Sequence, residues 1–359
     1  MGPHPAVAAV RHAVRASLAG LEPGEKLLAA CSGGPDSLAL AAALAFEAPR
    51  AGLMAGGVTI DHGLQAGSAA RAQRVAEVMT ALGLSPALSI AVTVRPRPGP
   101  AGSAASPYPG PEAAARAARY AALDQAAHST GAAWVLLGHT LDDQAETILL
   151  GLARGSGARS LAGMALRSGR YLRPLLGIRR DQARAACTAL GLEPWDDPQN
   201  RDPALTRARV RDQLMPALEE ALGPGVAAAL ARTADLFRAD ADALDGIAAA
   251  EADKLGGSAA AREYGWPATD LATLPEAIRH RLLRLAALAA GCPAGSLSRR
   301  HVARMDELVM SWHGQRWVDL PGGVRCGRRY GRLLLTTTGV TGDVPPTDAG
   351  GGSGGRSLC

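Results

Sequence analysis

The sequence is poor in several residue types that mark particular classes of protein. Its 359 residues include only two lysines, Lys26 and Lys254, and only 3% aromatic residues. The five cysteines are widely spaced and form no CxxC pair. Scattered cysteines in odd number argue against a disulfide framework and fit a reducing compartment, and the lack of CxxC weakens metal-cluster and dithiol chemistry. The low aromatic content disfavours an RNA-binding surface built mainly on base stacking.

Long apolar runs are also missing. No stretch approaches the 18 uninterrupted apolar residues of a membrane span, and the first 20 residues lack the compact apolar core of a secretory signal. We therefore expect a cytoplasmic protein. The apolar fraction of 47% and the charged fraction of 20% are those of a globular protein. The length suggests about two domains.

The positive charge is unevenly distributed. The net charge is only +5, but seven arginines and no carboxylate lie between Glu146 and Asp181, and six arginines and no carboxylate lie between Glu276 and Asp306. A third such stretch contains Arg325, Arg328, Arg329 and Arg332. Local basic surfaces of this kind bind phosphate, although an arginine-rich composition also produces ordinary solvated faces.

The first half of the chain alternates strand and helix patterns. Short apolar runs predict strands at 27–34, 56–63, 88–94 and 132–140, and the segments between or after them predict helices at 36–48, 70–83, 112–131 and 141–155. Buried strands separated by helices indicate an α/β fold with a doubly wound parallel sheet. Such sheets bind ligands at the carboxyl ends of their strands.

The second half has a different pattern. Helical periodicity dominates 225–255 and 275–310, and a small β unit is expected at 317–338. We predict a catalytic domain at 1–218, a smaller, mainly helical substrate-binding domain at 219–340, and a disordered tail at 341–359, with the boundary near 218–225. The segment 94–111, rich in Pro, Gly and Ala, is predicted to be a surface loop.

A glycine-rich turn follows the first strand and opens the first helix of this pattern. Glycines let the backbone approach an anion closely, and a helix N-terminus offers free amides to phosphate. The turn lacks the lysine of the common NTPase loop, and a plain glycine turn with a helix cap is the alternative. We predict nucleotide binding by Ser32, Gly33, Gly34, Pro35, Asp36 and Ser37. Asp61 and His62, at the end of the second strand, either border the adenine or simply end that strand.

Acidic residues gather where the fourth strand gives way to its helix. Asp142 or Asp143 and Glu146 are three or four residues apart and share a helix face. Such a cluster can hold Mg²⁺ or bind an ammonium group. Thr140 and Asp143 also fit a capping box, which explains one acid but not the whole set.

Taken together, these motifs resemble the tRNA(Ile)-lysidine synthetase family of the PP-loop (N-type) ATP pyrophosphatases. The matching stretches are CSGGPDSLAL (31–40), DHGLQAGS (61–68), EAAARAARY (112–120), GHTLDDQAETILLGLARGSGARSLAGM (138–164), YLRPLL (171–176) and DDPQNRDPALTRARVRDQLMPAL (196–218). SGGxDS alone indicates the superfamily, whereas the stretch 138–164 points to lysidine synthesis.

The resemblance implies a two-step reaction that uses ATP and Mg²⁺. ATP adenylates the C2 carbonyl oxygen of the wobble cytidine in a tRNA(Ile) with a CAU anticodon. The ε-amine of free L-lysine then displaces AMP and forms lysidine, so that the tRNA reads AUA instead of AUG. The implied partners are therefore this tRNA and free lysine.

The resemblance also assigns roles to residues. Asp36 and Asp142 are expected near the metal, and Asp143 and Glu146 at the lysine. The catalytic set is Asp36, Asp143, Arg116 and Arg207, the two arginines stabilising the adenylated intermediate. The expected tRNA contacts are Arg119, Arg154, Arg159 and Arg211. One position departs from the family pattern. In that pattern an asparagine follows the arginine that corresponds to Arg207, whereas here Arg207 is followed by Ala208.

Two alternatives remain open from the sequence. One is another PP-loop enzyme, such as a tRNA thiolase, which usually needs the CxxC or cluster cysteines missing here. The other is a non-catalytic RNA- or nucleotide-binding protein on the same fold. RNA binding alone needs neither the intact glycine-rich turn nor the carboxylate set.

Overall fold

The computed structural model describes residues 2–61, 63, 67–92, 111–155, 157–197, 202–263, 265–315 and 317–337. His62, the tail 341–359 and nearly all of the predicted loop 94–111 lie outside the described residues. The chain divides into two compact units, 1–238 and 239–359. Within the described ranges, no helix has the length and apolar character needed to cross a membrane.

The N-terminal unit is built on a six-stranded sheet with the order β3-β2-β1-β4-β6-β5. Neighbouring strands are parallel except for β5, which is antiparallel to β6. The doubly wound parallel sheet predicted from the sequence is therefore confirmed, with β1 between β2 and β4. The strands are β1 (Lys26–Ala30), β2 (Met54–Asp61), β3 (Ala87–Ala91), β4 (Trp134–Leu137), β5 (Arg167–Ser168) and β6 (Tyr171–Leu172).

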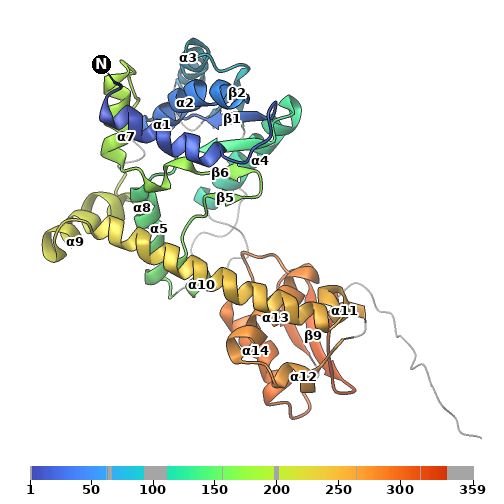
Figure 1. Cartoon of the computed structure of the whole chain (residues 1–359). Coiled ribbons are helices and arrows are strands. Elements are labelled where there is room, and N and C mark those ends of the chain that lie inside the picture. Colours follow the sequence, from blue (N-terminus) through green and yellow to red (C-terminus); the bar gives the residue numbers. More distant parts are fainter. Residues whose placement is uncertain are drawn as a thin grey trace, which may run out of the picture. The chain divides into compact units, whose positions relative to one another are not determined.

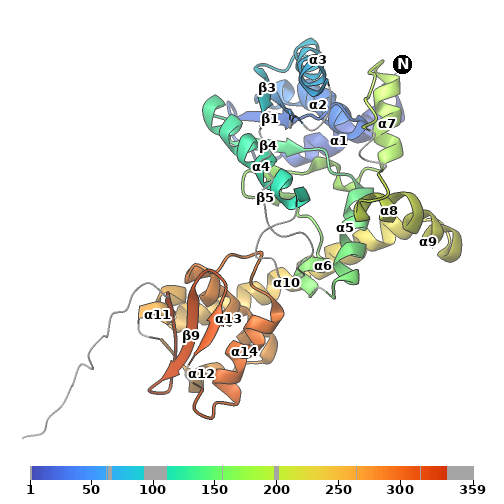
Figure 2. The same cartoon turned by 180° about the vertical axis from the view of Figure 1, so that it is seen from behind.

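Helices cover both faces of this sheet. On β1, Leu27 and Ala29 join the core under α1, α2, α3 and α7, whereas Leu28 joins the core under α4. This alternation follows from the two-residue period of a strand. Figure 1 shows α1 and α2 in front of the sheet, and the view from behind in Figure 2 brings α4 forward. The helices are α1 (Pro5–Leu18), α2 (Pro35–Glu47), α3 (Ser68–Ala81), α4 (Pro111–Thr130), α5 (Leu141–Ala153), α6 (Ala158–Leu161) and α7 (Arg180–Ala189).

The rest of the N-terminal unit is helical. The described residues of this unit include two short 3-10 turns, η1 (Pro49–Ala51) and η2 (Pro174–Gly177). Helix α8 (Thr206–Arg209) continues through the π-helical segment η4 (Val210–Leu214) into α9 (Met215–Leu222). The division between the units falls inside α10 (Val226–Lys254), later than the predicted 218–225. Arg238 on this helix donates to the carbonyls of Ala162 and Met164, so this part of α10 belongs to the N-terminal unit.

The C-terminal unit combines helices with a small antiparallel sheet of order β7-β10-β9-β8. The sequence predicted one helical segment over 275–310, but the chain turns at Gly291 and Pro293 and forms two helices there. Trp266 is fully buried in the core between helices and sheet. The elements are α11 (Gly257–Glu263), β7 (Trp266–Pro267), α12 (Ala268–Ala272), α13 (Glu276–Ala289), α14 (Arg299–Met310), β8 (Val318–Leu320), β9 (Val324–Arg329) and β10 (Arg332–Thr337).

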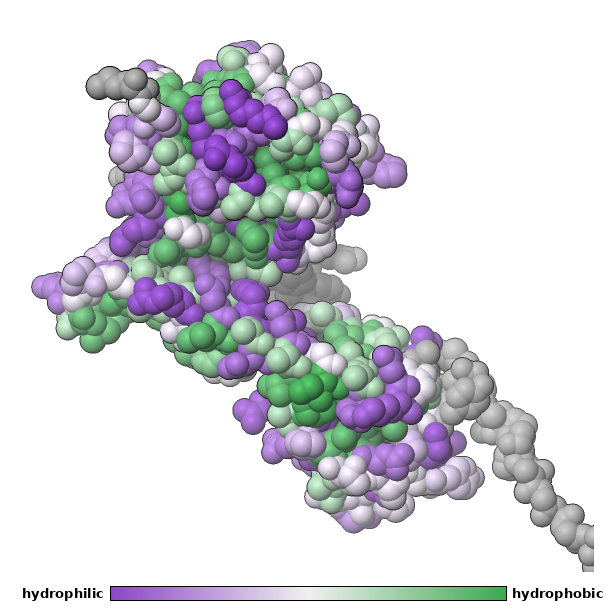
Figure 3. Space-filling model, viewed as in Figure 1, coloured by the Kyte–Doolittle hydropathy of each residue, from purple (hydrophilic) through white to green (hydrophobic). Residues whose placement is uncertain are grey.

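Half of the basic stretch between Glu276 and Asp306 is structural. Buried Arg279 pairs with Asp306 at 2.5 Å, and Arg281 Nε lies 2.8 Å from Asp245 Oδ1. Arg284 donates to the Leu297 carbonyl. The exposed members are Arg299, Arg300 and Arg304 on α14. In Figure 3, hydrophilic residues are mixed with hydrophobic ones over the surfaces of both units.

Candidate functional site

The glycine-rich turn leads directly from β1 into α2. Gly33 has a φ of +86°, and a Cβ there would lie 2.8 Å from Cγ2 of Val75. The Ser37 hydroxyl accepts the Ser32 amide at 3.1 Å and donates to the Gly34 carbonyl at 3.0 Å. Gly34 is the N-cap of α2 and forms no side-chain cap. The Ser37 hydroxyl therefore closes the glycine-rich turn. The backbone amides at the start of α2 remain available to an anion.

A second glycine brings the acidic segment next to this turn. Gly138 follows the last residue of β4, and a Cβ on it would lie 3.1 Å from the backbone carbon and oxygen of Asp36. Any side chain would push the end of β4 away from the start of α2. Gly138 therefore allows α5, which begins three residues later, to start beside the nucleotide-binding turn.

The start of α5 is held by the predicted capping box. The Thr140 amide donates to Asp143 Oδ2 at 2.9 Å, and the Asp143 amide donates to the Thr140 hydroxyl at 3.4 Å. Asp143 therefore does serve as part of a helix cap, the alternative role that its sequence position suggests. It uses only one carboxylate oxygen, because Oδ1 lies 3.1 Å from Nη2 of Arg180.

Glu146 lies at the centre of an arginine cluster. Its carboxylate is 1% exposed and is contacted by Arg207 Nε at 2.8 Å and Arg211 Nε at 2.8 Å. Arg180 Nη2 is 3.2 Å away. Arg207 and Arg211 are four residues apart across α8 and η4, so both reach the same carboxylate. A carboxylate this deeply buried is stable only when it is paired and hydrogen-bonded, as here.

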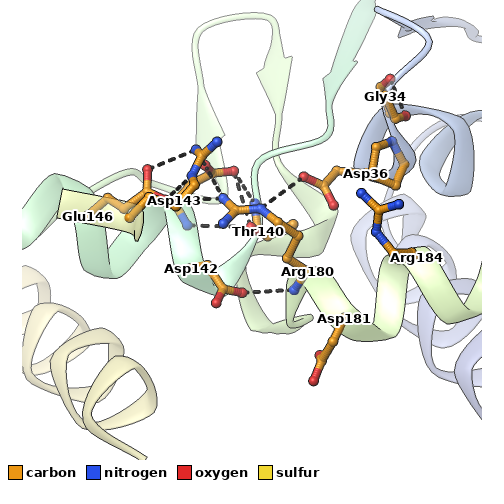
Figure 4. Close-up of polar contacts among 12 residues, drawn as sticks. Gly34, Asp36, Thr140, Asp142, Asp143, Glu146, Arg180, Asp181 and Arg184 are labelled. Carbon is orange, nitrogen blue, oxygen red and sulfur yellow. Dashed lines mark hydrogen bonds and ion pairs between the residues drawn. The ribbon is translucent and has the colours of Figure 1, made fainter. Parts of the chain in front are cut away.

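Arg180 connects the cluster with the nucleotide-binding turn. Figure 4 shows its guanidinium between Asp36 on one side and Asp143 and Glu146 on the other. Arg180 Nε lies 3.7 Å from Asp36 Oδ2, and the Arg180 amide donates to Asp142 Oδ2 at 2.8 Å. Sequence patterns do not mark Arg180 as a site residue. Its only local signal is its place at the start of a helix, which is also typical of a solvated arginine.

The position of α7 explains how Arg180 reaches this place. Cys187 on α7 is buried, and its Sγ donates to the Pro35 carbonyl at 3.2 Å. The amide of Leu141, the first residue of α5, donates to the Ile178 carbonyl at 2.9 Å just before α7 begins. Helix α7 is thereby attached to the starts of both α2 and α5.

Burial and charge set different protonation states in the cluster. Burial raises the pKa of Asp36 to about 7 against the opposing effect of Arg180. Burial alone would also raise the pKa of Asp143, but Arg180, the Thr140 amide and Arg207 outweigh it and hold this pKa below its usual value. Burial lowers the pKa of His139 to about 4. At neutral pH, Asp143 is therefore ionised, His139 is neutral, and Asp36 is close to its midpoint.

The carboxylates fit a magnesium ion only in a limited sense. Within the described residues, no three His, Cys, Asp or Glu side chains converge as a metal site. Asp36 Oδ1 is buried and has no hydrogen-bond partner there. Mg²⁺ typically uses one or two carboxylates and completes its shell with water and substrate phosphates. Asp36 fits this role, whereas Asp142 uses one oxygen to hold the start of α7.

Of the two arginines predicted on α4, Arg119 lies beside the site. It is near enough to His139 to contribute to its lowered pKa. Arg116 is exposed, donates to the Tyr120 hydroxyl at 3.2 Å and lies over that ring. Arg119 therefore borders the site from another helix, with Arg116 one turn before it.

The remaining residues singled out from the sequence lie in different parts of the N-terminal unit. Arg211, expected at the tRNA, contacts Glu146, whereas Arg154 and Arg159 are exposed. Arg154 caps the end of α5, roughly 12 Å along the helix axis from Glu146. Asp61 ends β2, where its Oδ1 accepts the Gly63 amide at 2.9 Å. Ala208 is buried, so the residue that departs from the family pattern packs in the interior.

Comparison with known proteins agrees with this architecture. A family model described as the PP-loop domain matches residues 8–218, and one described as the TilS substrate binding domain matches residues 267–334. A tRNA(Ile)-lysidine synthase from Thermobifida fusca is 57% identical over 335 residues, which cover 93% of this chain and 99% of that protein. The chain belongs to the tRNA(Ile)-lysidine synthase family. Another member, from Streptomyces coelicolor, is 53% identical over 368 residues and has the same coverage.

Membership in this family makes the chain an enzyme of the PP-loop ATP pyrophosphatases, as the sequence motifs predicted. Among solved structures, the U34-tRNA thiolase NcsA from Methanococcus maripaludis matches 65% of this chain and 80% of its own, with a TM-score of 0.51 and 18% identity. This likeness concerns the fold alone. The four described cysteines are buried rather than gathered in a cluster site.

Proposed function

We propose that this enzyme uses ATP to join free L-lysine to C2 of the wobble cytidine of a tRNA(Ile) with a CAU anticodon. In the first step the C2 carbonyl oxygen attacks the α-phosphorus of ATP, and the bond to the β-phosphate oxygen breaks to release pyrophosphate. In the second step the ε-amine of lysine attacks C2, and AMP leaves with the oxygen. The amine loses a proton to a nearby base.

The turn from Ser32 to Ser37 binds the ATP phosphates. Its support is the positive φ of Gly33 together with the uncapped start of α2, a 13-residue helix. Fixed amide donors stabilise charge that develops on phosphate oxygens, and they require no reorganisation during the reaction. Mg²⁺ bound through Asp36 would neutralise charge on the departing pyrophosphate.

Asp143 and Glu146 receive the lysine ammonium. Both carboxylates already contact arginines, so the incoming ammonium must replace one guanidinium contact. Arg180 is the contact that we assign to this exchange, because it can keep a carboxylate partner in Asp36 when it leaves Glu146. An ammonium with a pKa near 10 is not a nucleophile until it loses a proton. One of the two carboxylates that receive the ammonium, Asp143 or Glu146, is positioned to accept that proton.

Arginines stabilise the intermediate and bind the tRNA. We assign Arg116 and Arg207 to the adenylated cytidine: Arg207 contacts Glu146 from α8, and Arg116 is an exposed cation on α4. Arg119, Arg154 and Arg159 are the proposed tRNA contacts of the N-terminal unit, whereas Arg211 is assigned to holding Glu146. In the C-terminal unit, Arg299, Arg300 and Arg304 form an exposed basic group on α14 that suits the phosphate backbone.

The observation that carries this proposal is that one arginine, Arg180, contacts both the nucleotide-binding turn and the carboxylate pair. The test is to follow pyrophosphate release from ATP with tRNA(Ile) transcript, with and without lysine. The proposal expects release that depends on the tRNA, and AMP release that also depends on lysine. Pyrophosphate release that is indifferent to tRNA would contradict it.

A further inference from the structure

A groove of about 650 Å³ lies between α4 and the β5–β6 hairpin, and its lining contains none of the carboxylates of the cluster. Its walls combine aromatic and cationic side chains, and apart from Arg116 none of these residues has a role in the reaction described above. Tyr120 comes from α4 and Tyr171 from β6. The cations are Arg116 from α4, Arg170 from the hairpin and Arg173 after β6.

The two tyrosines form the aromatic wall. Their ring centroids are 4.9 Å apart at an interplanar angle of 70°, and the Tyr171 hydroxyl donates to the Tyr120 carbonyl at 3.3 Å. The chain has only five tyrosines, and two of them meet here. The Tyr171 hydroxyl also lies 2.8 Å from Asp124 Oδ1, so the ring is fixed in place at the groove.

Arg173 is a buried cation without a complete set of partners. It is 7% exposed, and its Nη1 donates to the Ala165 carbonyl at 2.9 Å. Its Nε is buried and has no hydrogen-bond partner among the described residues. A buried donor left unpaired costs free energy, so such a group indicates a missing acceptor.

The groove favours an anion in spite of one acidic residue. Three arginines line it, and the single carboxylate is Asp124, which is held by Tyr171 and lies 3.6 Å from Arg170 Nε. The net charge of the lining is therefore positive. Aromatic rings beside arginines are the combination that binds single-stranded nucleic acid, with bases on the rings and phosphates on the guanidinium groups.

The groove extends from the reaction toward the start of β6. In the sheet order, β6 is two strands away from β1, a lateral separation of roughly 10 Å. Through β4, Tyr171 is level with Leu28 of β1, four residues before Ser32, which adds roughly 13 Å along the strands. Arg173, at the other end of the groove, is near enough to His139 to contribute to its lowered pKa. A base that reacts with ATP above β1 would therefore leave another nucleotide of the same RNA loop at the groove.

We propose that this groove holds one nucleotide of the tRNA loop that carries the reacting cytidine, with its base against Tyr120 and Tyr171 and its phosphate at Arg170 and Arg173. The inference rests on the proposed function for the identity of the RNA. It adds a binding site that orients the anticodon loop and leaves the phosphates of ATP to the turn after β1.

The test uses the full-length enzyme with three variants of the groove and one control. Tyr120→Leu removes an aromatic face, Arg170→Gln removes an exposed cation, and Asp124→Asn removes the carboxylate. Arg50→Gln is the control, because Arg50 is exposed and precedes β2, which lies on the other side of β1 from β6 and the groove. For each protein, the KM for tRNA and for ATP and the salt dependence of tRNA binding are measured, and thermal unfolding checks the fold.

Tyr120→Leu is expected to raise the KM for tRNA about tenfold with the KM for ATP unchanged. Arg170→Gln should weaken tRNA binding and reduce its log–log salt slope by about 0.7, the value for one single-strand phosphate. Asp124→Asn should bind tRNA at least as tightly as the native enzyme, and Arg50→Gln should match it. A raised KM for ATP with an unchanged KM for tRNA would assign the groove to ATP and overturn the inference.

Two further outcomes separate this inference from the proposed function. If the native enzyme transfers lysine but the Tyr120 and Arg170 variants keep the native KM for tRNA, the groove assignment is wrong and the proposed function stands. If the native enzyme binds tRNA without transferring lysine and both variants weaken that binding, the groove assignment stands and the proposed function is wrong.

Discussion

Arg180 and Glu146 are 34 residues apart in the sequence, and their Nη2 and Oε1 atoms lie 3.2 Å apart. Arg180 also lies 3.7 Å from Asp36 in the nucleotide-binding turn. The glycine-rich turn after β1 and the buried carboxylates are thus joined through one guanidinium. A ligand that displaces Arg180 from Glu146 would therefore also change the position of Arg180 beside Asp36.

Replacing Arg180 should impair catalysis more than folding. Arg180→Lys keeps a positive charge but offers one ammonium in place of a planar fork, so it cannot reach Asp36, Asp143 and Glu146 together. We expect tRNA-dependent pyrophosphate release to fall at least about tenfold, equivalent to roughly 1.4 kcal/mol of transition-state stabilisation. The neighbouring Arg179, which is exposed, provides the control Arg179→Lys. Equal rates for both variants would remove Arg180 from the mechanism.

Replacing Glu146 should affect both stability and lysine binding. Glu146→Gln leaves Arg207 and Arg211 without their main carboxylate, and breaking a buried pair typically costs about 3 kcal/mol of unfolding free energy. The lysine KM should rise at least about tenfold if an ammonium contact worth roughly 1.4 kcal/mol is lost.

Urea unfolding and steady-state kinetics measure these two effects. Asp143→Asn should raise the lysine KM in the same direction. Asp319→Asn disrupts the exposed pair with Arg325 and should change stability by less than about 1 kcal/mol. An unchanged lysine KM and turnover in both Glu146→Gln and Asp143→Asn would refute the lysine site.

The two glycines of the nucleotide-binding turn should respond differently to alanine. Gly33→Ala places a Cβ 2.8 Å from Val75 at a φ of +86°, and we expect a loss of about 2 kcal/mol of unfolding free energy. Gly34 has a φ of −74°, and its Cβ would meet Ser32 Oγ at 3.7 Å, an ordinary contact. Gly34→Ala should therefore stay within about 0.5 kcal/mol of the native protein. Urea titrations of both variants, with and without ATP, test this difference.

His139 should make folding stability depend on pH. Its pKa falls from 6.5 to about 4 on folding, so the folded state disfavours the protonated ring. Its stabilising contribution is complete above pH 6.5 and is lost as the pH falls from 6.5 to 4, by up to about 3 kcal/mol. The difference in unfolding free energy between the native protein and His139→Gln, followed from pH 7 to pH 4, reports this contribution. A difference that stays constant with pH would contradict the assignment.

The parts of the fold that sequence could predict are those with strong local patterns. All four strand–helix pairs of the parallel sheet were predicted, because each is a buried apolar run followed by an amphipathic or capped helix. Strands β5 and β6 were missed, since two residues each are too few to show a period. Helix α1 was also missed. Its buried residues are spaced three or four apart, as on one face of a helix, so the sequence does contain the signal; they are Val7, Val10, Val14 and Leu18.

The candidate site divides in the same way. Asp36, Asp143 and Glu146 belong to compact motifs, so the sequence could select them without knowledge of the fold. Arg180 could not be selected, because its role depends on α7 packing against the starts of α2 and α5. Arg211 is the opposite case, because the sequence selects this residue but does not show which group it contacts. Its place in a basic segment predicted a tRNA contact, and only the π-helical segment after α8 reveals that it reaches Glu146.

The central claim is that lysine is transferred to a specific tRNA at this site. The most direct measurement is incorporation of labelled lysine into unmodified CAU-anticodon tRNA(Ile), with ATP and Mg²⁺ present and tRNA(Met) as the competing substrate. The account predicts label in tRNA(Ile) alone, with one AMP and one pyrophosphate released for each lysine incorporated. Pyrophosphate release without lysine incorporation, or equal labelling of tRNA(Met), would contradict it.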